Sequence, residues 1–232
     1  MISLKFIIAG VGPGDPDMIT ADALRAIREA DLVLIPHSHA ERASAAEQIV
    51  RAHIPELDAV PLLFPMTSDA EKRDASLYGQ LEALRPRWQG AQTVVLPVIG
   101  DSTLYSTGFY LYNLWKDMVP DLKLELKPGI SAHNFAAALT GSFLAMSDEI
   151  FAVVSATAPR ERIISALKAA DSAALYKPAA LKGALRETVE AAGPWKRILR
   201  ADRAGLPGQK IIEGSAALEP PDEYLSVLLL WK

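Results

Sequence analysis

An apolar run that ends at a glycine and continues into polar residues constrains the fold of this chain most strongly. Thr93-Val-Val-Leu-Pro-Val-Ile99 is typical of a buried strand, and it leads directly into Gly100-Asp-Ser-Thr-Leu-Tyr-Ser-Thr107. Near the N-terminus, the apolar residues 5–10 precede Val11-Gly-Pro-Gly-Asp-Pro16 in the same way. Open α/β sheets build their ligand loops at such strand ends. The sequence therefore predicts two loops that face one crevice.

Strand-like and helix-like segments alternate along the first half of the chain, which predicts a mostly parallel sheet. The expected strands there are 5–10, 32–35, 59–64, 93–99 and 123–127, and the expected helices are 20–31, 44–52, 70–88 and 109–115. In the second half we expect helices at 131–140, 159–169 and 179–192, and strands at 150–155, 173–176, 198–200, 210–212 and 224–231. Because residues 225–230 show little polar alternation, the last strand is expected to lie centrally in its sheet.

These segments predict an α/β protein with two lobes. Residues 1–128 form a lobe with a mostly parallel five-stranded sheet, and residues 129–232 form a lobe with a mixed sheet. A length of 232 residues suits two modest lobes, and a hydrophobic content of 50% supplies both cores.

Composition excludes several classes of function. The net charge of −4 provides no general attraction for nucleic acid or anionic membranes, so neither is an expected partner. The absence of cysteine excludes disulfides, thiolate zinc sites and a cysteine nucleophile. The N-terminal residues lack the zones of a signal peptide, and no apolar run is long enough to span a membrane. We therefore expect a soluble, cytoplasmic protein.

The first glycine loop does not match the known phosphate-binding patterns. Glycines at positions 10, 12 and 14 leave Asp15 where a dinucleotide fingerprint needs its third glycine. Pro13 and Pro16 lack the N–H groups that cradle phosphate, and Asp15 would repel it. A plain tight turn is the alternative interpretation of this loop.

Two loops with one carboxylate each suit a ligand that is rich in hydroxyl and amino groups and poor in phosphate, such as S-adenosylmethionine (SAM). A carboxylate against the sulfonium would stabilise the ground state more than the transition state, so we expect carbonyls near the sulfur. Asp101 is then expected to bind hydroxyl or amino groups, or to fix its own loop through an Asx-type bond. A simple turn residue is the alternative for Asp101.

Three motifs in order resemble segments of the tetrapyrrole (corrin/porphyrin) methyltransferases, which use SAM. The family's first loop is similar to Gly10-Val-Gly-Pro-Gly-Asp-Pro16, its G-D-P-x-x-Y loop to Gly100-Asp-Ser-Thr-Leu-Tyr105, and its P-G-[VI]-S segment to Pro128-Gly-Ile-Ser131. Residues 201–207 and 224–230 also look like family segments. Ser102 departs from the pattern, because the family usually has proline there, and the loop is to that degree less rigid.

Within the family, Phe64-Pro-Met-Thr-Ser-Asp69 and Tyr105-Ser-Thr-Gly-Phe-Tyr110 are most similar to the members that methylate C-20 of precorrin-2, or of its cobalt form, in cobalamin synthesis. The resemblance implies a SAM-dependent C-methyltransferase that acts on a tetrapyrrole as a homodimer and without a metal. Other members act at different ring carbons, on an elongation-factor side chain or on ribosomal RNA, and fold alone does not choose among them. A SAM- or tetrapyrrole-binding protein without turnover is a further alternative.

The resemblance also implies a SAM site in a cleft between the lobes, with the substrate trough on the first lobe. The implied SAM contacts are Pro13, Gly100, Asp101, Ser102, Leu104, Ser131, Ala132, Tyr176 and Ala204. The substrate carboxylates call for guanidinium groups, and the candidates, each of which has a solvated surface charge as its alternative, are Arg42, Arg73, Arg160, Arg162 and Arg203. His37, His39 and Tyr105 are candidates to face the ring and to accept the proton lost after methyl transfer, with His37 and Tyr105 as the candidate catalytic residues.

Two other chemistries compete with this interpretation. Gly129-Ile-Ser-Ala-His133 has the context of a hydrolase nucleophile elbow but lacks its final glycine, and helix capping explains Ser131. Replacing Ser131 with alanine would abolish a hydrolase but only weaken SAM binding in a methyltransferase. His37 and His39 lie at a strand end as in some metal sites, yet no further ligands at suitable spacing accompany them.

Overall fold

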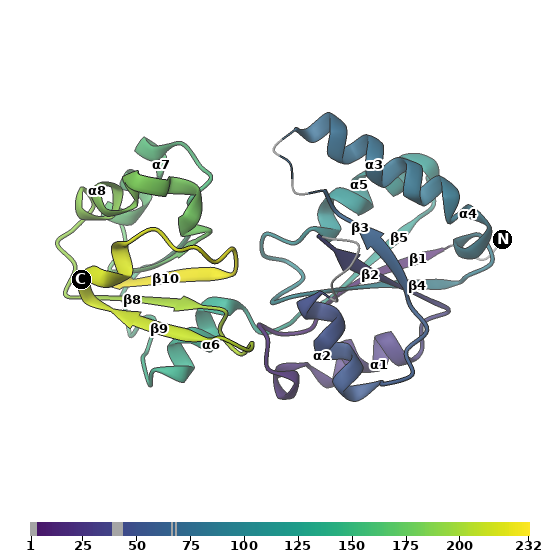
Figure 1. Ribbon diagram of the computed structural model, residues 1–232, viewed down its shortest axis with the longest axis horizontal. Helices are drawn as coiled ribbons and strands as arrows, with labels where there is room; N and C mark the ends of the chain where they lie inside the picture. Colours follow the sequence, from purple (N-terminus) through teal and green to yellow (C-terminus); the bar gives the residue numbers. More distant parts are fainter. Residues whose placement is uncertain (1–3, 39–43, 66, 68) are drawn as a thin grey trace. The chain divides into compact units, whose positions relative to one another are not determined.

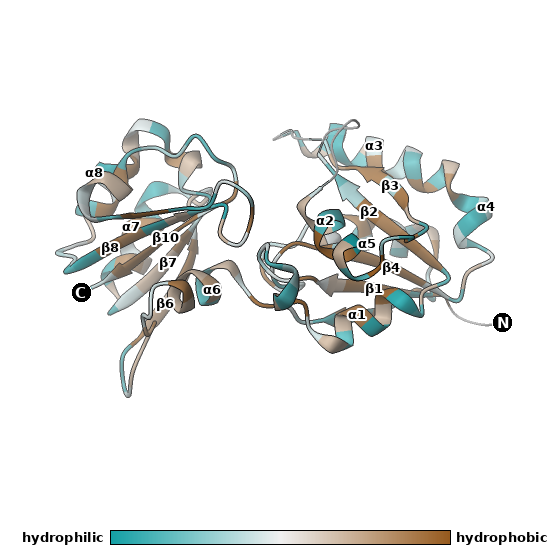
Figure 2. Ribbon diagram, turned by 60° about the horizontal axis from the view of Figure 1, so that its bottom comes forward, coloured by the Kyte–Doolittle hydropathy of each residue, from teal (hydrophilic) through white to brown (hydrophobic). Residues whose placement is uncertain are grey.

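The computed structural model describes residues 4–38, 44–65, 67 and 69–232. The chain divides into two compact units, Met1–Ser131 and Ala132–Lys232. Each unit is built on one sheet with helices packed against it, which confirms the predicted class of two α/β lobes. Figure 2 shows that the central strands of both sheets are apolar, whereas the outer faces of the helices are polar.

The sheet of the first unit, here called sheet A, is parallel in every pairing, as its alternating strands and helices predict. Its spatial order is β3-β2-β4-β1-β5. The strands are β1 (Lys5–Gly10), β2 (Leu32–His37), β3 (Val60–Leu63), β4 (Thr93–Val98) and β5 (Lys123–Lys127). The central strands are almost entirely buried, whereas the edge strands β3 and β5 alternate or are largely exposed.

Helices cover both faces of sheet A, because successive side chains of a strand point to opposite faces. Phe6 and Ile8 of β1 pack with the helices of one face, and Ile7 and Ala9 pack with those of the other. The first face carries α3 (Ala70–Ala83), α4 (Arg85–Trp88) and α5 (Gly108–Met118). The second carries α1 (Ala21–Arg28) and α2 (Ala45–His53), as Figure 1 shows, and a short 3₁₀ turn, η1 (Pro16–Met18), precedes α1.

The sheet of the second unit, sheet B, is mixed and has the order β6-β7-β10-β8-β9. Its strands are β6 (Phe151–Ser155), β7 (Ser172–Tyr176), β8 (Arg197–Asp202), β9 (Lys210–Glu213) and β10 (Ser226–Trp231). β10 is antiparallel to both of its neighbours and lies at the centre, which confirms the prediction from its unbroken apolar pattern. The remaining elements of this unit are α6 (Ala132–Leu139), α7 (Arg160–Lys168), α8 (Leu185–Glu190) and two 3₁₀ segments, η2 (Pro178–Ala184) and η3 (Gly214–Leu218).

The prediction of single helices over 70–88 and 179–192 is wrong. The first is interrupted at Leu84, because Pro86 lies in the first turn of α4 and has no N–H with which to continue the hydrogen-bonding of α3. The second is interrupted at Lys182, whose φ of 50° and ψ of −132° are not helical, so that η2 precedes α8. Most other boundaries lie within a few residues of those predicted.

No helix in the described part of the chain combines the length and the apolar character needed to span a membrane.

Candidate functional site

The topology of sheet A identifies one edge as the place for a ligand. β1 and β4 are neighbours, but the chain leaves β1 through α1 towards β2 and leaves β4 through α5 towards β5, in opposite directions across the sheet. α1 and α5 also cover opposite faces of the sheet. Ligands of open α/β sheets bind outside the carboxyl ends of the strands at such a reversal. The loops that follow β1 and β4 therefore flank the candidate site.

Backbone hydrogen bonds join these two loops. Gly100 N donates to Gly12 O at 2.7 Å, and Gly12 N donates to Gly100 O at 3.2 Å. Val11 N also donates to Val98 O at 2.9 Å, so the pairing of β1 with β4 extends into the loops. The predicted pair of loops is thus joined into one hydrogen-bonded junction within the first unit.

A third loop, residues 128–131 after β5, packs against this junction. A Cβ atom at Gly129 would overlap the carbonyl oxygen of Gly100, and one at Gly10 would lie 2.7 Å from Gly129 N. The three loops therefore meet backbone to backbone, and only glycine fits at positions 10 and 129.

Gly100 differs from these two crowded glycines. Its φ of 76° is in the left-handed region, and a Cβ built on it has no atom within 4 Å. Glycine is needed there for its conformation, and the open space beside it lets another molecule approach the backbone closely. This combination is the property expected of a ligand-binding backbone position.

The carboxylate of Asp101 links the second loop to the third. Oδ1 accepts hydrogen bonds from Thr103 N at 2.8 Å and from Thr103 Oγ1, and Oδ2 accepts one from Gly129 N at 2.8 Å. Asp101 therefore forms an Asx-type turn and also positions the Gly129 backbone. A direct contact between Asp101 and a cofactor stays a prediction.

The other predicted residues of the first unit occupy these same loops. Pro13 is buried in the first loop, and Leu104 and Ser131 are half-buried in the second and third. Ser102 is 4% exposed, and its Oγ has no hydrogen-bond partner among the described residues. The structure thus brings Pro13, Gly100–Ser102 and Ser131 to one edge of sheet A.

His37, a predicted proton acceptor, ends β2 at that same edge. Its Nε2 lies 3.0 Å from Glu47 Oε2, and Glu47 Oε1 accepts a hydrogen bond from Arg51 Nε at 2.8 Å. The carboxylate orients the imidazole and favours the proton on Nε2, so Nδ1 is the basic atom. Within the described residues Nδ1 is buried and without a partner. Sequence reasoning missed Glu47, although its position in the first turn of α2 was a visible signal.

Tyr105, the second predicted proton acceptor, lies in the loop between β4 and α5. Its φ of 51° is unusual for a residue with a side chain, and 42% of the residue is exposed. Partial burial raises the pKa of the Tyr105 phenol above its ordinary value. A protonated phenol donates a hydrogen bond but is a poor base, which favours His37 for the predicted proton transfer.

The predicted contacts of the second unit lie at the ends of its elements. Tyr176 ends β7 and Ala204 follows β8, and because both strands are antiparallel to β10 they share one edge of sheet B. Ala132 begins α6, and the hydroxyl of Tyr176 lies 2.7 Å from His133 Nδ1 on the next residue of that helix. Sequence reasoning did not anticipate this pair, because the two residues are far apart along the chain.

Of the predicted arginines, Arg73 lies at the start of α3 with Cζ 3.9 Å from the centroid of the Tyr110 ring. Arg160 pairs with Glu187 at 2.7 Å and Arg203 with Glu223 at 3.5 Å. Arg162 is exposed on α7. His39, Arg42, Met66 and Ser68 lie outside the described residues.

Among the residues that are described, no group of three or more His, Asp or Glu side chains is placed to hold a metal ion.

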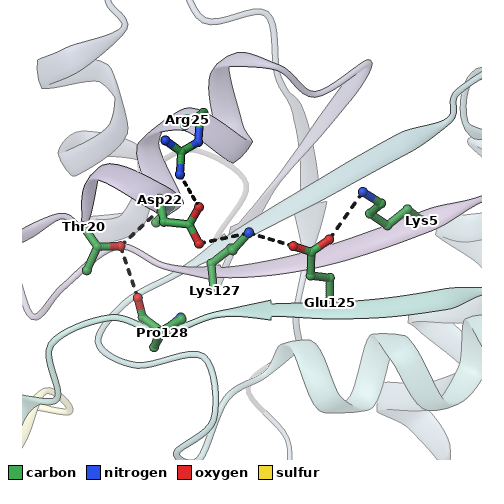
Figure 3. A network of polar contacts seen from close by, with 8 residues as sticks. Lys5, Thr20, Asp22, Arg25, Glu125, Lys127 and Pro128 are labelled. Atoms are coloured by element: carbon green, nitrogen blue, oxygen red, sulfur yellow. Dashed lines mark hydrogen bonds and ion pairs between the residues drawn. The ribbon is translucent and has the colours of Figure 1, made fainter.

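A network of ion pairs and hydrogen bonds adjoins the start of the third loop (Figure 3). Lys127 Nζ, at the end of β5, lies 2.9 Å from Asp22 Oδ2 and 2.7 Å from Glu125 Oε1. Thr20 Oγ1 donates to Pro128 O at 3.2 Å and accepts from Ala23 N at 3.2 Å as the cap of α1. The hydrogen bonds that Lys127 donates lower the pKa of both carboxyl groups, and the same bonds, accepted by Glu125 and Asp22, raise the pKa of Lys127.

This network predicts a dependence of stability on pH. A carboxylate whose native pKa is lowered stabilises the fold above its ordinary pKa, and that stability is lost as the pH falls through the native value. We expect the free energy of unfolding to fall on acidification from about pH 5, and Lys127→Met to reduce this dependence. Urea titrations over a pH series measure it, with the exposed Lys123→Met of the same strand as the matched control. Equal pH slopes in Lys127→Met and the unaltered chain would contradict the prediction.

Comparisons with known proteins show the family to which the chain is similar. The sequence profile described as Tetrapyrrole (Corrin/Porphyrin) Methylases matches residues 5–218. Cobalamin biosynthesis protein CobIJ of Mycobacterium tuberculosis is 26% identical over 95% of this chain, which spans only 44% of that protein's length. The cobalt-precorrin-2 C(20)-methyltransferase of Salmonella typhimurium is 30% identical, over 89% of this chain and 86% of its own.

A solved structure shares the fold. The uroporphyrin-III C-methyl transferase of Thermus thermophilus, complexed with S-adenyl homocysteine, matches with a TM-score of 0.72 at 17% identity. The match covers 98% of this chain and 97% of that chain.

Proposed function

Because the chain belongs to the tetrapyrrole (corrin/porphyrin) methylases, we propose that it transfers the methyl group of SAM to C-20 of precorrin-2, or of the cobalt-containing form, in cobalamin synthesis. The observation that carries the proposal is the similarity to the Salmonella C(20)-methyltransferase across most of both chains. The segments around Phe64 and Tyr105 support the same assignment, because they look most like that subgroup.

The loops of sheet A fit SAM better than a nucleotide phosphate. Pro13 contributes no N–H donor, and the Asp101 carboxylate is engaged by Thr103 and Gly129, so the loops form no phosphate cradle. The open backbone at Gly100 suits the adenosine and amino-acid groups of SAM, which are recognised through hydrogen bonds. We infer that Pro13, Gly100–Ser102, Leu104 and Ser131 hold SAM, and the contributions of Ala132, Tyr176 and Ala204 stay predictions from the resemblance.

SAM, when bound, supplies a methyl group on a positively charged sulfur. The protein's task is then chiefly to orient the two reactants, because an electron-rich ring carbon attacks such a methyl group without a covalent enzyme intermediate. Orientation of this kind contributes about 7–11 kcal/mol to lowering a barrier. The junction of three loops provides the required rigidity. We propose that His37, which Glu47 orients, accepts the proton that the ring carbon loses.

The remaining expectations belong to this proposal. We propose that the protein works in the cytoplasm as a homodimer and requires no metal of its own. A tetrapyrrole is its partner, and neither nucleic acid nor a membrane is.

The test is incubation of the purified chain with methyl-labelled SAM and precorrin-2, with and without cobalt in the ring. We expect release of S-adenosylhomocysteine and a product that has gained one labelled methyl group. NMR should assign this methyl group to C-20. A label at another ring carbon would assign a different family activity. Retention of both ligands without turnover would show a binding protein instead of an enzyme. Comparison of the two rates decides which form of the macrocycle is the substrate.

A further inference from the structure

Three exposed aromatic residues lie within six positions of one another where the second loop continues into α5. Tyr105 is 42% exposed, Phe109 60% and Tyr110 37%. Phe109 and Tyr110 belong to the first turn of α5, and their rings meet edge to face with centroids 5.9 Å apart. Single exposed apolar side chains are common, but a group of them indicates a binding surface.

Arg73 adds an oriented positive charge to this group. Its guanidinium lies over the Tyr110 ring, with 3.9 Å from Cζ to the centroid. Nε and Nη2 are each 2.8 Å from Asp74 Oδ1, and Nη1 has no hydrogen-bond partner in the described part of the chain. Because these contacts already hold the side chain, less entropy is lost when an outside carboxylate binds to it.

The topology places these residues beside the candidate cofactor site. α3 and α5 follow β3 and β4 in a parallel sheet, so both helices begin at the carboxyl edge of sheet A. Arg73 lies near the start of α3, and the aromatic residues continue directly from the loop that carries Gly100. We call Arg73, Tyr105, Phe109 and Tyr110 the aromatic face.

We propose that the aromatic face binds the flat ring of the tetrapyrrole by stacking, and that Arg73 binds one of its peripheral carboxylates. This inference rests on the proposed function and identifies the side chains that hold its substrate. Aromatic rings stack favourably on a conjugated macrocycle, and a guanidinium matches the geometry of a carboxylate. A local cation is required because the chain as a whole carries a net charge of −4 and would otherwise repel a polyacid.

Two other occupants fit the aromatic face less well. Nucleic-acid bases also stack on aromatic rings, but their backbone needs a basic track, and here a single arginine accompanies the rings. A protein partner would use the same residue types as an anchor. The continuity of the aromatic face with the Gly100 loop favours a ligand that shares the site with SAM.

The experiment measures the binding of precorrin-2 to protein saturated with S-adenosylhomocysteine, so that no turnover occurs. Phe109→Ser combined with Tyr110→Ser is expected to raise the dissociation constant of precorrin-2 about tenfold, since each lost stacking contact accounts for about a two- to tenfold change. Arg73→Gln is expected to weaken binding by a similar factor, and the loss should shrink at high salt. The affinity for S-adenosylhomocysteine should not change.

The matched control is Tyr78→Ser, because Tyr78 is 48% exposed on α3 and lies outside the aromatic face. Thermal unfolding verifies that each variant is folded, and Phe109→Ser alone changes only an exposed ring. Unchanged precorrin-2 affinity in the double variant, with methylation intact in the unaltered chain, would overturn the inference and leave the proposed function standing. If the double variant changes its association state but keeps its affinity for precorrin-2, the inference is overturned and the aromatic face is assigned to a protein partner. If the unaltered chain neither binds nor methylates a tetrapyrrole, the proposed function fails and the inference fails with it.

Discussion

Replacing Gly100 with valine is expected to reduce the affinity for SAM about a hundredfold or more. The φ of 76° at this position is unfavourable for any branched side chain. The added atoms would also occupy the open space through which a ligand reaches the loop backbone. Calorimetric titration with S-adenosylhomocysteine measures the affinity, and thermal unfolding measures the cost to the fold.

Gly214→Val is the matched control for this substitution. Gly214 has a φ of 69° and an equally open Cβ position, but it lies at the start of η3 in the second unit. Both variants carry the same kind of backbone strain. A loss of SAM affinity in Gly100→Val alone would therefore show that the ligand binds at the Gly100 loop. Unaltered affinity in a folded Gly100→Val protein would remove the second loop from the cofactor site.

The second large effect is expected at Asp101. Asp101→Asn places an amide group where two oxygens now accept hydrogen bonds, so the bond from Gly129 N or those from Thr103 must be lost. A hydrogen bond to a charged group is worth about 1.5–3 kcal/mol, and we expect a loss of stability of about that size. We also expect weaker SAM binding, because the third loop is no longer held against the second.

Two further variants separate the roles of Asp101. Asp101→Ala removes both links, whereas Thr103→Val removes only the bond from the threonine hydroxyl and keeps the bridge to Gly129. If the bridge to Gly129 positions the loops, Asp101→Ala should weaken SAM binding more than Thr103→Val does. Calorimetry on both decides this. Wild-type affinity in Asp101→Ala would exclude Asp101 from the cofactor site, and would show that the junction is held by backbone contacts alone.

The sheet elements were predictable because local pattern determines them. Apolar runs mark β1, β4 and β10, and glycine follows or ends the first two. In the first unit, the alternation of such runs with helical segments implies parallel pairing. The two helix interruptions have weaker local signals, because a proline in the first turn is compatible with a helix and Lys182 is not a strong helix breaker. The helical spacing of apolar residues continues across both interruptions, so this spacing alone predicts a single helix in each case.

The candidate site was predictable only in part. Glycines that follow apolar runs identified the loops, since a close backbone approach leaves that signature in sequence. The contact between Gly12 and Gly100, and that between Asp101 and Gly129, join segments that no local pattern relates. The same holds for Tyr176 and His133, and for the guanidinium of Arg73 over Tyr110. These depend on tertiary packing, which decides the partner of each polar group.

The central position of β10 has a consequence for how the second unit is made. β6 pairs with β7 and β8 pairs with β9, but only β10 connects the two halves of sheet B. Without residues 226–231, the sheet would therefore consist of two separate pieces, the parallel pair β6–β7 and the antiparallel pair β8–β9. The first unit, by contrast, has all its strands once residue 127 is synthesised. The core of the second unit is thus complete only when β10 has inserted between β7 and β8.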